Sequence, residues 1–136
     1  MDDYVLIVDD DQDARQILST IVKSLDVDAE AASDGLEALQ LARKRIPKLI
    51  LLDLMMPNMD GYTMLSRIRG NPRTRYIPVI VVTACSVDQL LMLKLPGVKD
   101  VVQKGDLTNL KTLVEETLGS IIPPSGGTGD WKPSTS

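Results

Sequence analysis

Polar side chains capable of chemistry follow four of the apolar runs in this sequence, at the points where those runs end. In chain order they are Asp9, Asp10, Asp11, Asp53, Thr83 and Lys104. Clustered carboxylates repel one another, and burial raises the pKa of a carboxyl group unless a cation compensates. Mg²⁺ would compensate well, because it accepts one or two protein carboxylates and leaves other positions for water and phosphate oxygens. If these residues converge, we expect a magnesium site that takes a phosphoryl group.

The residue types at such a site assign a role to each member. Asp53 would be the nucleophile and would form an aspartyl-phosphate. Mg²⁺ and Lys104 would neutralise charge on the phosphoryl oxygens, and the Thr83 hydroxyl would hydrogen-bond one of them. Asp11 is better interpreted as a carboxylate at a helix N-terminus, where the helix dipole favours it.

Composition excludes several other kinds of chemistry. The 136 residues include no histidine and one cysteine, so triads that use histidine, histidine-ligated metals and intrachain disulfides are all excluded. A net charge of −4 argues against a nucleic-acid or anionic membrane surface. No signal peptide or transmembrane-length apolar run occurs, and we therefore expect a cytoplasmic protein.

Apolar and amphipathic segments alternate along the chain, which is long enough for one domain. Strands are expected at 4–8, 27–32, 49–52, 79–82 and 98–103, and helices at 13–25, 34–46, 60–70, 86–95 and 106–118. The strands are mostly apolar runs, as in a parallel sheet that is covered on both faces. Functional groups in such α/β folds gather at the carboxyl ends of the strands. Residues 120–136 are rich in Pro, Gly, Ser and Thr and predict a disordered tail or linker after a domain of residues 1–119.

Four motifs together resemble the receiver domain of two-component response regulators. They are VLIVDDD, LILLDLMMPNMDG, VIVVTA and VVQKG, one at the end of each of four expected strands. The resemblance implies a flavodoxin-like (βα)5 fold, a doubly wound five-stranded parallel sheet of order 2-1-3-4-5. It implies that Asp53 is the phosphoacceptor, that Asp9 and Asp10 bind Mg²⁺ with Asp53 and the Met55 backbone carbonyl, and that Thr83 and Lys104 contact the phosphoryl group.

The resemblance also implies function and partners. The expected donor is a phosphohistidine on a sensor histidine kinase or a histidine phosphotransfer protein. The chain would catalyse only its own phosphorylation and slow dephosphorylation, and would then switch conformation for a protein partner. The family's usual output face lies between Ser86 and Leu118. Apolar residues from Leu90 to Leu95 cover more than one helical face there, as expected of either a broad core-facing side or a homodimer or target-protein surface.

Two departures from the family pattern leave alternatives open. Gly105 stands where the family usually has a proline after the lysine, and Val101 stands where it often has an aromatic residue that takes part in switching. A receiver-like interaction module with weakened switching is therefore one alternative. An aspartate-nucleophile phosphohydrolase is another, but such enzymes need an acid two residues after the nucleophile, where this chain has Met55.

Overall fold

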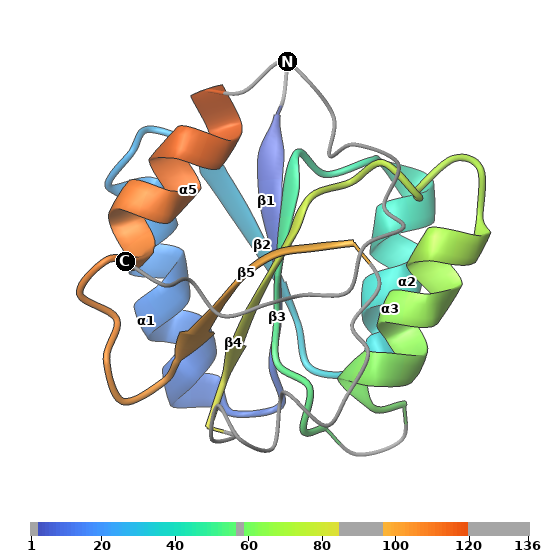
Figure 1. Cartoon of the computed structure of the whole chain (residues 1–136), viewed down its shortest axis with the longest axis horizontal. Helices are drawn as coiled ribbons and strands as arrows, with labels where there is room; N and C mark the ends of the chain where they lie inside the picture. Colours follow the sequence, from blue (N-terminus) through green and yellow to red (C-terminus); the bar gives the residue numbers. More distant parts are fainter. Residues whose placement is uncertain (1–2, 57–58, 85–96, 120–136) are drawn as a thin grey trace.

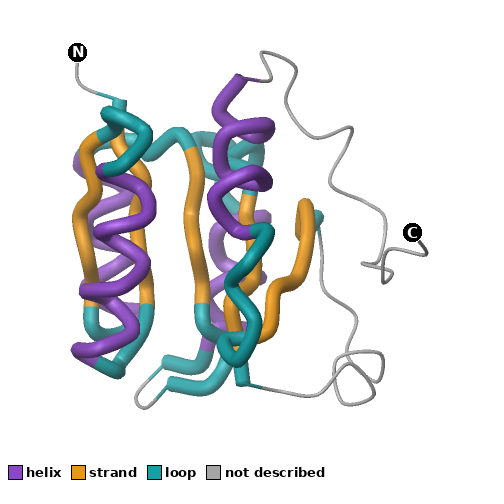
Figure 2. Tube along the Cα trace, turned by 90° about the vertical axis from the view of Figure 1, so that its left-hand side faces the viewer, coloured by secondary structure: helices purple, strands orange, loops and turns teal. Residues whose placement is uncertain are grey.

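One parallel five-stranded sheet organises the computed structural model, which describes residues 3–56, 59–84 and 97–119. The strands are β1 (Tyr4–Val8), β2 (Asp28–Ala32), β3 (Leu49–Leu52), β4 (Val79–Thr83) and β5 (Val98–Gln103). Their order is β2-β1-β3-β4-β5, so the predicted doubly wound sheet of order 2-1-3-4-5 is confirmed. Figure 2 shows this sheet with β5 at one edge.

Helices cover both faces of the sheet, as Figure 1 shows. In the described part of the chain they are α1 (Gln12–Lys23), α2 (Gly35–Lys44), α3 (Gly61–Gly70) and α5 (Leu110–Gly119). The α1 and α5 helices lie on one face, and α2 and α3 lie on the other. The helix predicted at 86–95 and the tail predicted at 120–136 fall outside the described residues. No described helix has the length and apolar character needed to cross a membrane.

The central strands are apolar because both of their faces are buried. Every residue of β1, β3 and β4 is buried. Alternate side chains along a strand point to opposite faces, so Leu6 and Ile50 join the core under α2 and α3, whereas Ile7 and Leu51 join the core under α1 and α5. This two-sided burial fixes where each strand ends, and therefore where the polar residues that follow it must lie.

Carboxylates begin three of the helices. Asp11 accepts a hydrogen bond from the Asp13 amide, Asp34 accepts one from the Glu37 amide, and Asp60 accepts one from the Thr63 amide. Each side chain satisfies a backbone donor that has no partner within its helix. The predictions that Asp11, Asp34 and Asp60 are helix-terminal residues are confirmed.

The last helix begins later than the sequence predicts. The expected start was Asp106, whereas α5 begins at Leu110. The Asp106 carboxylate instead accepts hydrogen bonds from the backbone amide of Thr108 at 3.2 Å and from its hydroxyl at 2.6 Å. These local bonds close a turn that competes with the first turn of a helix.

Two large apolar residues of α1 and α2 are exposed, although helical spacing in the sequence aligns them with the apolar stripes of these helices. Ile17 is 52% exposed and Leu36 is 53% exposed. The buried stripe of α1 runs through Leu18 and Val22, which are one helical turn apart, and Ile17 is rotated about 100° from Leu18. In both helices, helical spacing alone therefore predicts one more buried residue than the structure buries.

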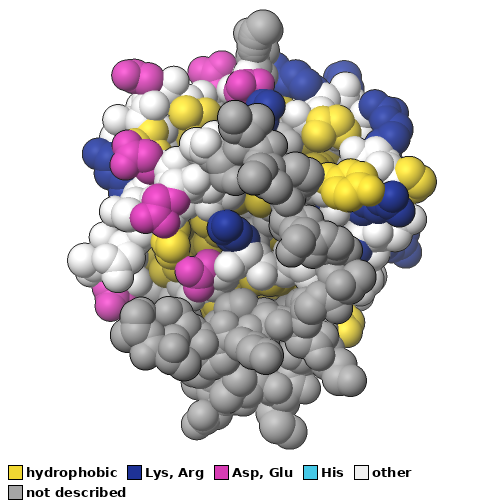
Figure 3. All heavy atoms as spheres, turned by 45° about the horizontal axis from the view of Figure 1, so that its top comes forward, with side chains coloured by type: hydrophobic (Ala, Val, Ile, Leu, Met, Phe, Trp, Pro, Cys, Tyr) yellow, Lys and Arg dark blue, Asp and Glu magenta, His cyan; other side chains and the backbone are white. Residues whose placement is uncertain are grey.

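Charge is unevenly distributed over the end of the molecule that carries the strand N-termini. Figure 3 shows Lys and Arg side chains gathered on the side of α2 and α3, and Asp and Glu side chains on the opposite side. Cations in the last turns of α2 (Arg43 and Lys44) and α3 (Arg67 and Arg69) lie where the helix dipole favours them.

Candidate functional site

Backbone hydrogen bonds hold three polar residues in place just beyond the ends of the strands. The Asp53 amide donates to the Val8 carbonyl at 2.9 Å, and the Asp9 amide donates to the Ala32 carbonyl at 3.1 Å. The Lys104 amide donates to the carbonyl of Thr83 at 2.9 Å. Each bond extends the ladder between neighbouring parallel strands by one step. The three residues are thus held by the sheet itself at its carboxyl end.

Lys104 joins the two buried carboxylates of the site. Its Nζ lies 2.8 Å from Asp9 Oδ2 and 3.1 Å from Asp53 Oδ2. The Asp9 and Asp53 side chains are only 1% and 4% exposed, whereas the Lys104 side chain is 25% exposed. One ammonium group therefore lies between two carboxylates that would otherwise repel each other at close range.

Asp10 completes a group of three carboxylates that could hold a metal ion. Single carboxylate oxygens of Asp9, Asp10 and Asp53 lie within 4.8 Å of one another, and Asp10 is the exposed member. Within the described chain, buried Asp9 Oδ2 accepts no hydrogen bond of good geometry and has only its ion pair with Lys104. Oxygen donors around an incompletely satisfied buried carboxylate fit a hard divalent cation such as Mg²⁺.

The two partners of the buried ion pair both have shifted pKa values. Burial raises the pKa of the Asp9 carboxyl group, although Lys104 and the Asp11 amide oppose this shift. Burial by itself lowers the pKa of Lys104, but its contacts with Asp9 and Asp53 outweigh that effect and raise the pKa. Lys104 is therefore firmly cationic, while the structure disfavours the charged form of Asp9.

The remaining predicted site residues lie around this pair. Thr83 is fully buried at the end of β4 and binds Lys104 through its backbone carbonyl. The Met55 amide donates to Asp53 Oδ1 at 3.1 Å, and the Met55 side chain is 64% exposed. The metal-ligand role of the Met55 carbonyl stays a prediction.

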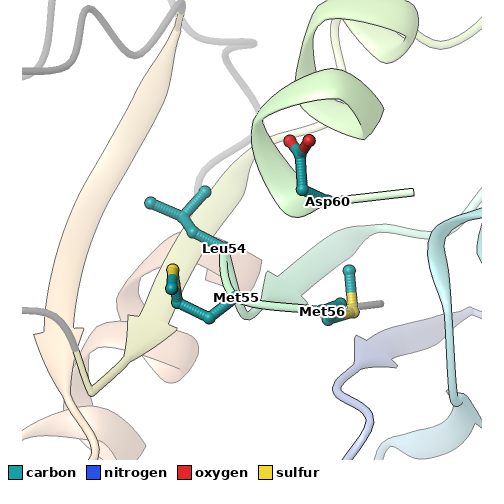
Figure 4. A pocket seen from close by; sticks show the side chains of 4 residues that line it. All are labelled: Leu54, Met55, Met56 and Asp60. Carbon is teal, nitrogen blue, oxygen red and sulfur yellow. The ribbon is translucent and has the colours of Figure 1, made fainter. Parts of the chain in front are cut away.

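An open hollow lies beside the loop that follows Asp53. Its volume is about 340 Å³, and it is lined by Leu54, Met55, Met56 and Asp60. Figure 4 shows Leu54 and Met55 pointing to one side of the loop, with Asp60 at the start of α3. The side chain two residues after Asp53 is thus a thioether at the surface, which cannot transfer a proton.

Arg15 is a site residue that sequence reasoning missed. Its Nη1 donates to the Asp9 backbone carbonyl at 2.8 Å, which ties α1 to the strand end that carries the acidic residues. No sequence pattern marks a side chain that binds a backbone carbonyl six residues away.

Gly61 supports the loop after Asp53 because it has no side chain. A Cβ at this position would lie 2.4 Å from the Asp53 carbonyl oxygen and 2.5 Å from Leu54 Cα, both of which are backbone atoms. The Gly61 amide also donates to the Leu54 carbonyl at 3.0 Å. Close packing of backbone against backbone thus requires a glycine here and shapes the loop after Asp53.

The first departure from the family pattern is glycine in place of the usual proline after Lys104, and the structure shows the geometry of the peptide bond between Lys104 and Gly105. No cis peptide bond occurs among the described residues, so the bond between Lys104 and Gly105 is trans. Gly105 does not adopt a positive φ, and no atom would crowd a Cβ there. Val101, the second departure, is partly buried against the core under α2 and α3.

A sequence profile of the response regulator receiver domain matches residues 5–115. The chain belongs to this family. Receiver domains bind Mg²⁺ in an acidic pocket, and the three carboxylates of this chain form such a group. They belong to two-component signalling and interact with sensor kinases or phosphotransfer proteins.

Named relatives agree with this assignment. Response regulator PleD of Caulobacter vibrioides is 39% identical over 80 residues, which are 59% of this chain and 18% of PleD. The chain thus spans less than a fifth of that protein. The receiver domain of a histidine kinase from Syntrophus aciditrophicus has a TM-score of 0.78 and 30% identity, covering 88% of this chain and 92% of that one.

A third relative carries the expected metal. The receiver domain of a sensor histidine kinase from Pseudomonas aeruginosa, solved with a magnesium ion coordinated in its active-site cleft, has a TM-score of 0.76 and 25% identity. The similarity covers 88% of this chain and all of that one (100%).

Because the pKa of Asp9 is raised, ionisation of this residue should lower the free energy of unfolding of the receiver domain. The unfolded state ionises at lower pH than the folded state, so the free energy of unfolding falls as pH rises through the folded-state pKa. Without metal at pH 7, Asp9→Asn should therefore raise the free energy of unfolding. This gain should vanish below the ordinary carboxyl pKa, where Asp9 is neutral in both states. Denaturant titrations with a chelator, at both pH values, would check this. A variant less stable than wild type at pH 7 would contradict it.

The close packing at Gly61 predicts a sharp contrast between two glycines of α3. Gly61→Ala should lower the free energy of unfolding by about 1–3 kcal/mol, because its methyl group would overlap backbone atoms beside Asp53. Gly70→Ala is the matched control, since no atom lies within 4 Å of a Cβ there. It should be neutral or slightly stabilising. Equal stability of the two variants in urea unfolding would refute the packing argument.

Proposed function

We propose that this receiver domain accepts a phosphoryl group on Asp53 with the help of Mg²⁺. The observation that carries the proposal is the arrangement around Asp53, a buried carboxylate that shares a lysine ammonium with Asp9 and lies beside Asp10. A carboxylate held between cations is a good phosphoryl acceptor, because the same cations can neutralise the incoming phosphoryl oxygens.

The proposed reaction transfers a phosphoryl group from a phosphohistidine. An Asp53 carboxylate oxygen forms a bond to phosphorus while the phosphorus–nitrogen bond of the donor imidazole breaks, and the imidazole keeps the electron pair. Asp9, Asp10, Asp53 and the Met55 carbonyl would hold Mg²⁺. When bound, the metal would neutralise charge on the phosphoryl oxygens. Lys104 would contact one of these oxygens, and the Thr83 hydroxyl would donate a hydrogen bond to another.

Slow hydrolysis would make the phosphorylated domain a switch rather than an enzyme with a separate substrate. Aspartate-nucleophile phosphohydrolases place an acid two residues after the nucleophile, and here that residue is Met55. A thioether can neither protonate a leaving group nor activate water. This residue favours the switch over the phosphohydrolase.

Partners and setting are part of the same proposal. The donor would be a sensor histidine kinase or a histidine phosphotransfer protein, and the place of action would be the cytoplasm. A target protein or a second copy of the chain would bind the face between Ser86 and Leu118, of which the structure describes β5 and α5. The receiver domain would comprise residues 1–119, with residues 120–136 acting as a tail or linker.

Phosphorylation by a small donor tests the proposal directly. Incubation of the chain with acetyl phosphate and Mg²⁺ should add the mass of one phosphoryl group, and Asp53→Asn should abolish this addition. Lys104→Met should slow it by about 10²-fold, because a cation that stabilises the transferring oxygens is lost. Intact-protein mass spectrometry over time gives both results.

Asp60→Asn is the control, because asparagine caps a helix as well as aspartate does and Asp60 lies outside the carboxylate group. It should be phosphorylated at the wild-type rate. Phosphorylation that persists in Asp53→Asn, or that proceeds equally well with a chelator, would sink the proposal.

A further inference from the structure

Arg69, in the last turn of α3, binds the backbone at the entrances of two strands. Its Nη1 donates to the carbonyl oxygens of Arg75 at 2.8 Å and of Ile77 at 2.7 Å. Its Nη2 donates to the carbonyl oxygen of Gly97 at 2.7 Å. Ile77 lies just before β4, and Gly97 directly precedes β5. A run of arginines in this region would ordinarily be interpreted as a solvated surface, but Arg69 is partly buried.

The strand that Arg69 holds contains one residue too many for a regular ladder. Val79 pairs with Val98, whereas the next residue of β4, Ile80, pairs with Asp100. Lys99 is therefore a bulge in β5. Because β5 is an edge strand, β4 is its only partner among the strands that the structure describes. An edge strand whose ladder is interrupted by a bulge can slip along its neighbour unless its ends are fixed.

The far end of β5 is the end that carries Lys104. Beyond the bulge, Val101 pairs with Val81 and Gln103 pairs with Thr83, and the Lys104 amide then binds the Thr83 carbonyl. A slip of one residue would turn every following side chain to the other face of the sheet. Lys104 would then point away from the two carboxylates.

We propose that Arg69 is a positioning residue for Lys104, because its guanidinium group fixes the start of β5 against the start of β4 and so prevents β5 from slipping along β4. The inference rests on the proposed role of Lys104 in phosphorylation. An arginine suits this task, since its planar fork presents separate donors to all three carbonyl groups in fixed geometry. A single ammonium group cannot reproduce that geometry.

Two arginines of α3 supply a matched pair of variants. Arg69→Gln removes the clamp, and Arg67→Gln makes the same charge change at an exposed position two residues away. The full chain is treated with acetyl phosphate and Mg²⁺ at a temperature where both variants are folded. Arg69→Gln should be phosphorylated at least about fivefold more slowly than wild type, and Arg67→Gln at the wild-type rate. If Arg69→Gln does not fold, Arg69→Lys takes its place in the same comparison.

Hydrogen exchange reports the register without relying on phosphorylation. The Lys104 amide hydrogen should exchange at least about fivefold faster in Arg69→Gln than in wild type, because its bond to the Thr83 carbonyl depends on register. The Asp53 amide, which is bonded to Val8 on β1, should keep its wild-type rate relative to global unfolding.

Deletion of Lys99 separates positioning from general stability. Without the extra residue, Val98 and Asp100 follow each other in a regular ladder opposite Val79 and Ile80. The deletion should therefore restore the phosphorylation rate of Arg69→Gln toward wild type, even if the melting temperature stays low. A loss that was merely structural would not be restored in this way.

The outcomes are distinguishable. Wild-type phosphorylation and exchange rates in Arg69→Gln, with or without a lower melting temperature, would overturn the inference. Failure of the Lys99 deletion to restore either rate would also overturn it. Absence of phosphorylation in the wild-type chain would refute the proposed function instead, and the exchange rate of the Lys104 amide would then decide whether Arg69 sets the register.

Discussion

A single ammonium group between two buried carboxylates is the interaction on which this site depends. Lys104 Nζ contacts Asp9 at 2.8 Å and Asp53 at 3.1 Å, and both acids are almost fully buried. Two such carboxylates repel each other and lose hydration on burial, so each would be disfavoured as an anion without a nearby cation. One lysine leaves the group of three acids with excess negative charge, which a bound Mg²⁺ would balance.

Backbone hydrogen bonds of the sheet position the charged residues of the site. Asp9, Asp53 and Lys104 each continue a ladder by one hydrogen bond, so their positions follow from the register of β1, β3 and β5. The central strands are fixed because both of their faces are buried. The edge strand β5 lacks that constraint, carries a bulge and is clamped at its start by Arg69. The register of β5, the strand that ends next to Lys104, thus depends on contacts from outside the sheet.

Much of this arrangement could be predicted from the sequence, because it depends on local patterns. Apolar runs predict the strands, and carboxylates such as Asp60 predict where helices begin. Asp9, Asp53 and Lys104 are predicted to lie together because each follows the carboxyl end of a strand in a parallel sheet. Contacts from side chains to distant backbone carbonyls, such as those of Arg15 and Arg69, leave no pattern in the sequence. Burial on helices was predicted too broadly, because Ile17 is apolar and yet lies beside the buried stripe.

The claim that Lys104 and a divalent cation balance the same carboxylates is tested most directly by magnesium affinity. Mg²⁺ would be titrated into wild type, Lys104→Met and Asp10→Asn, with binding followed through the amide resonances of Asp9 and Asp53. The account predicts that Lys104→Met binds Mg²⁺ at least about fivefold more tightly, because a competing positive charge is removed, and that Asp10→Asn binds it more weakly. Unchanged or weaker binding by Lys104→Met would contradict the account.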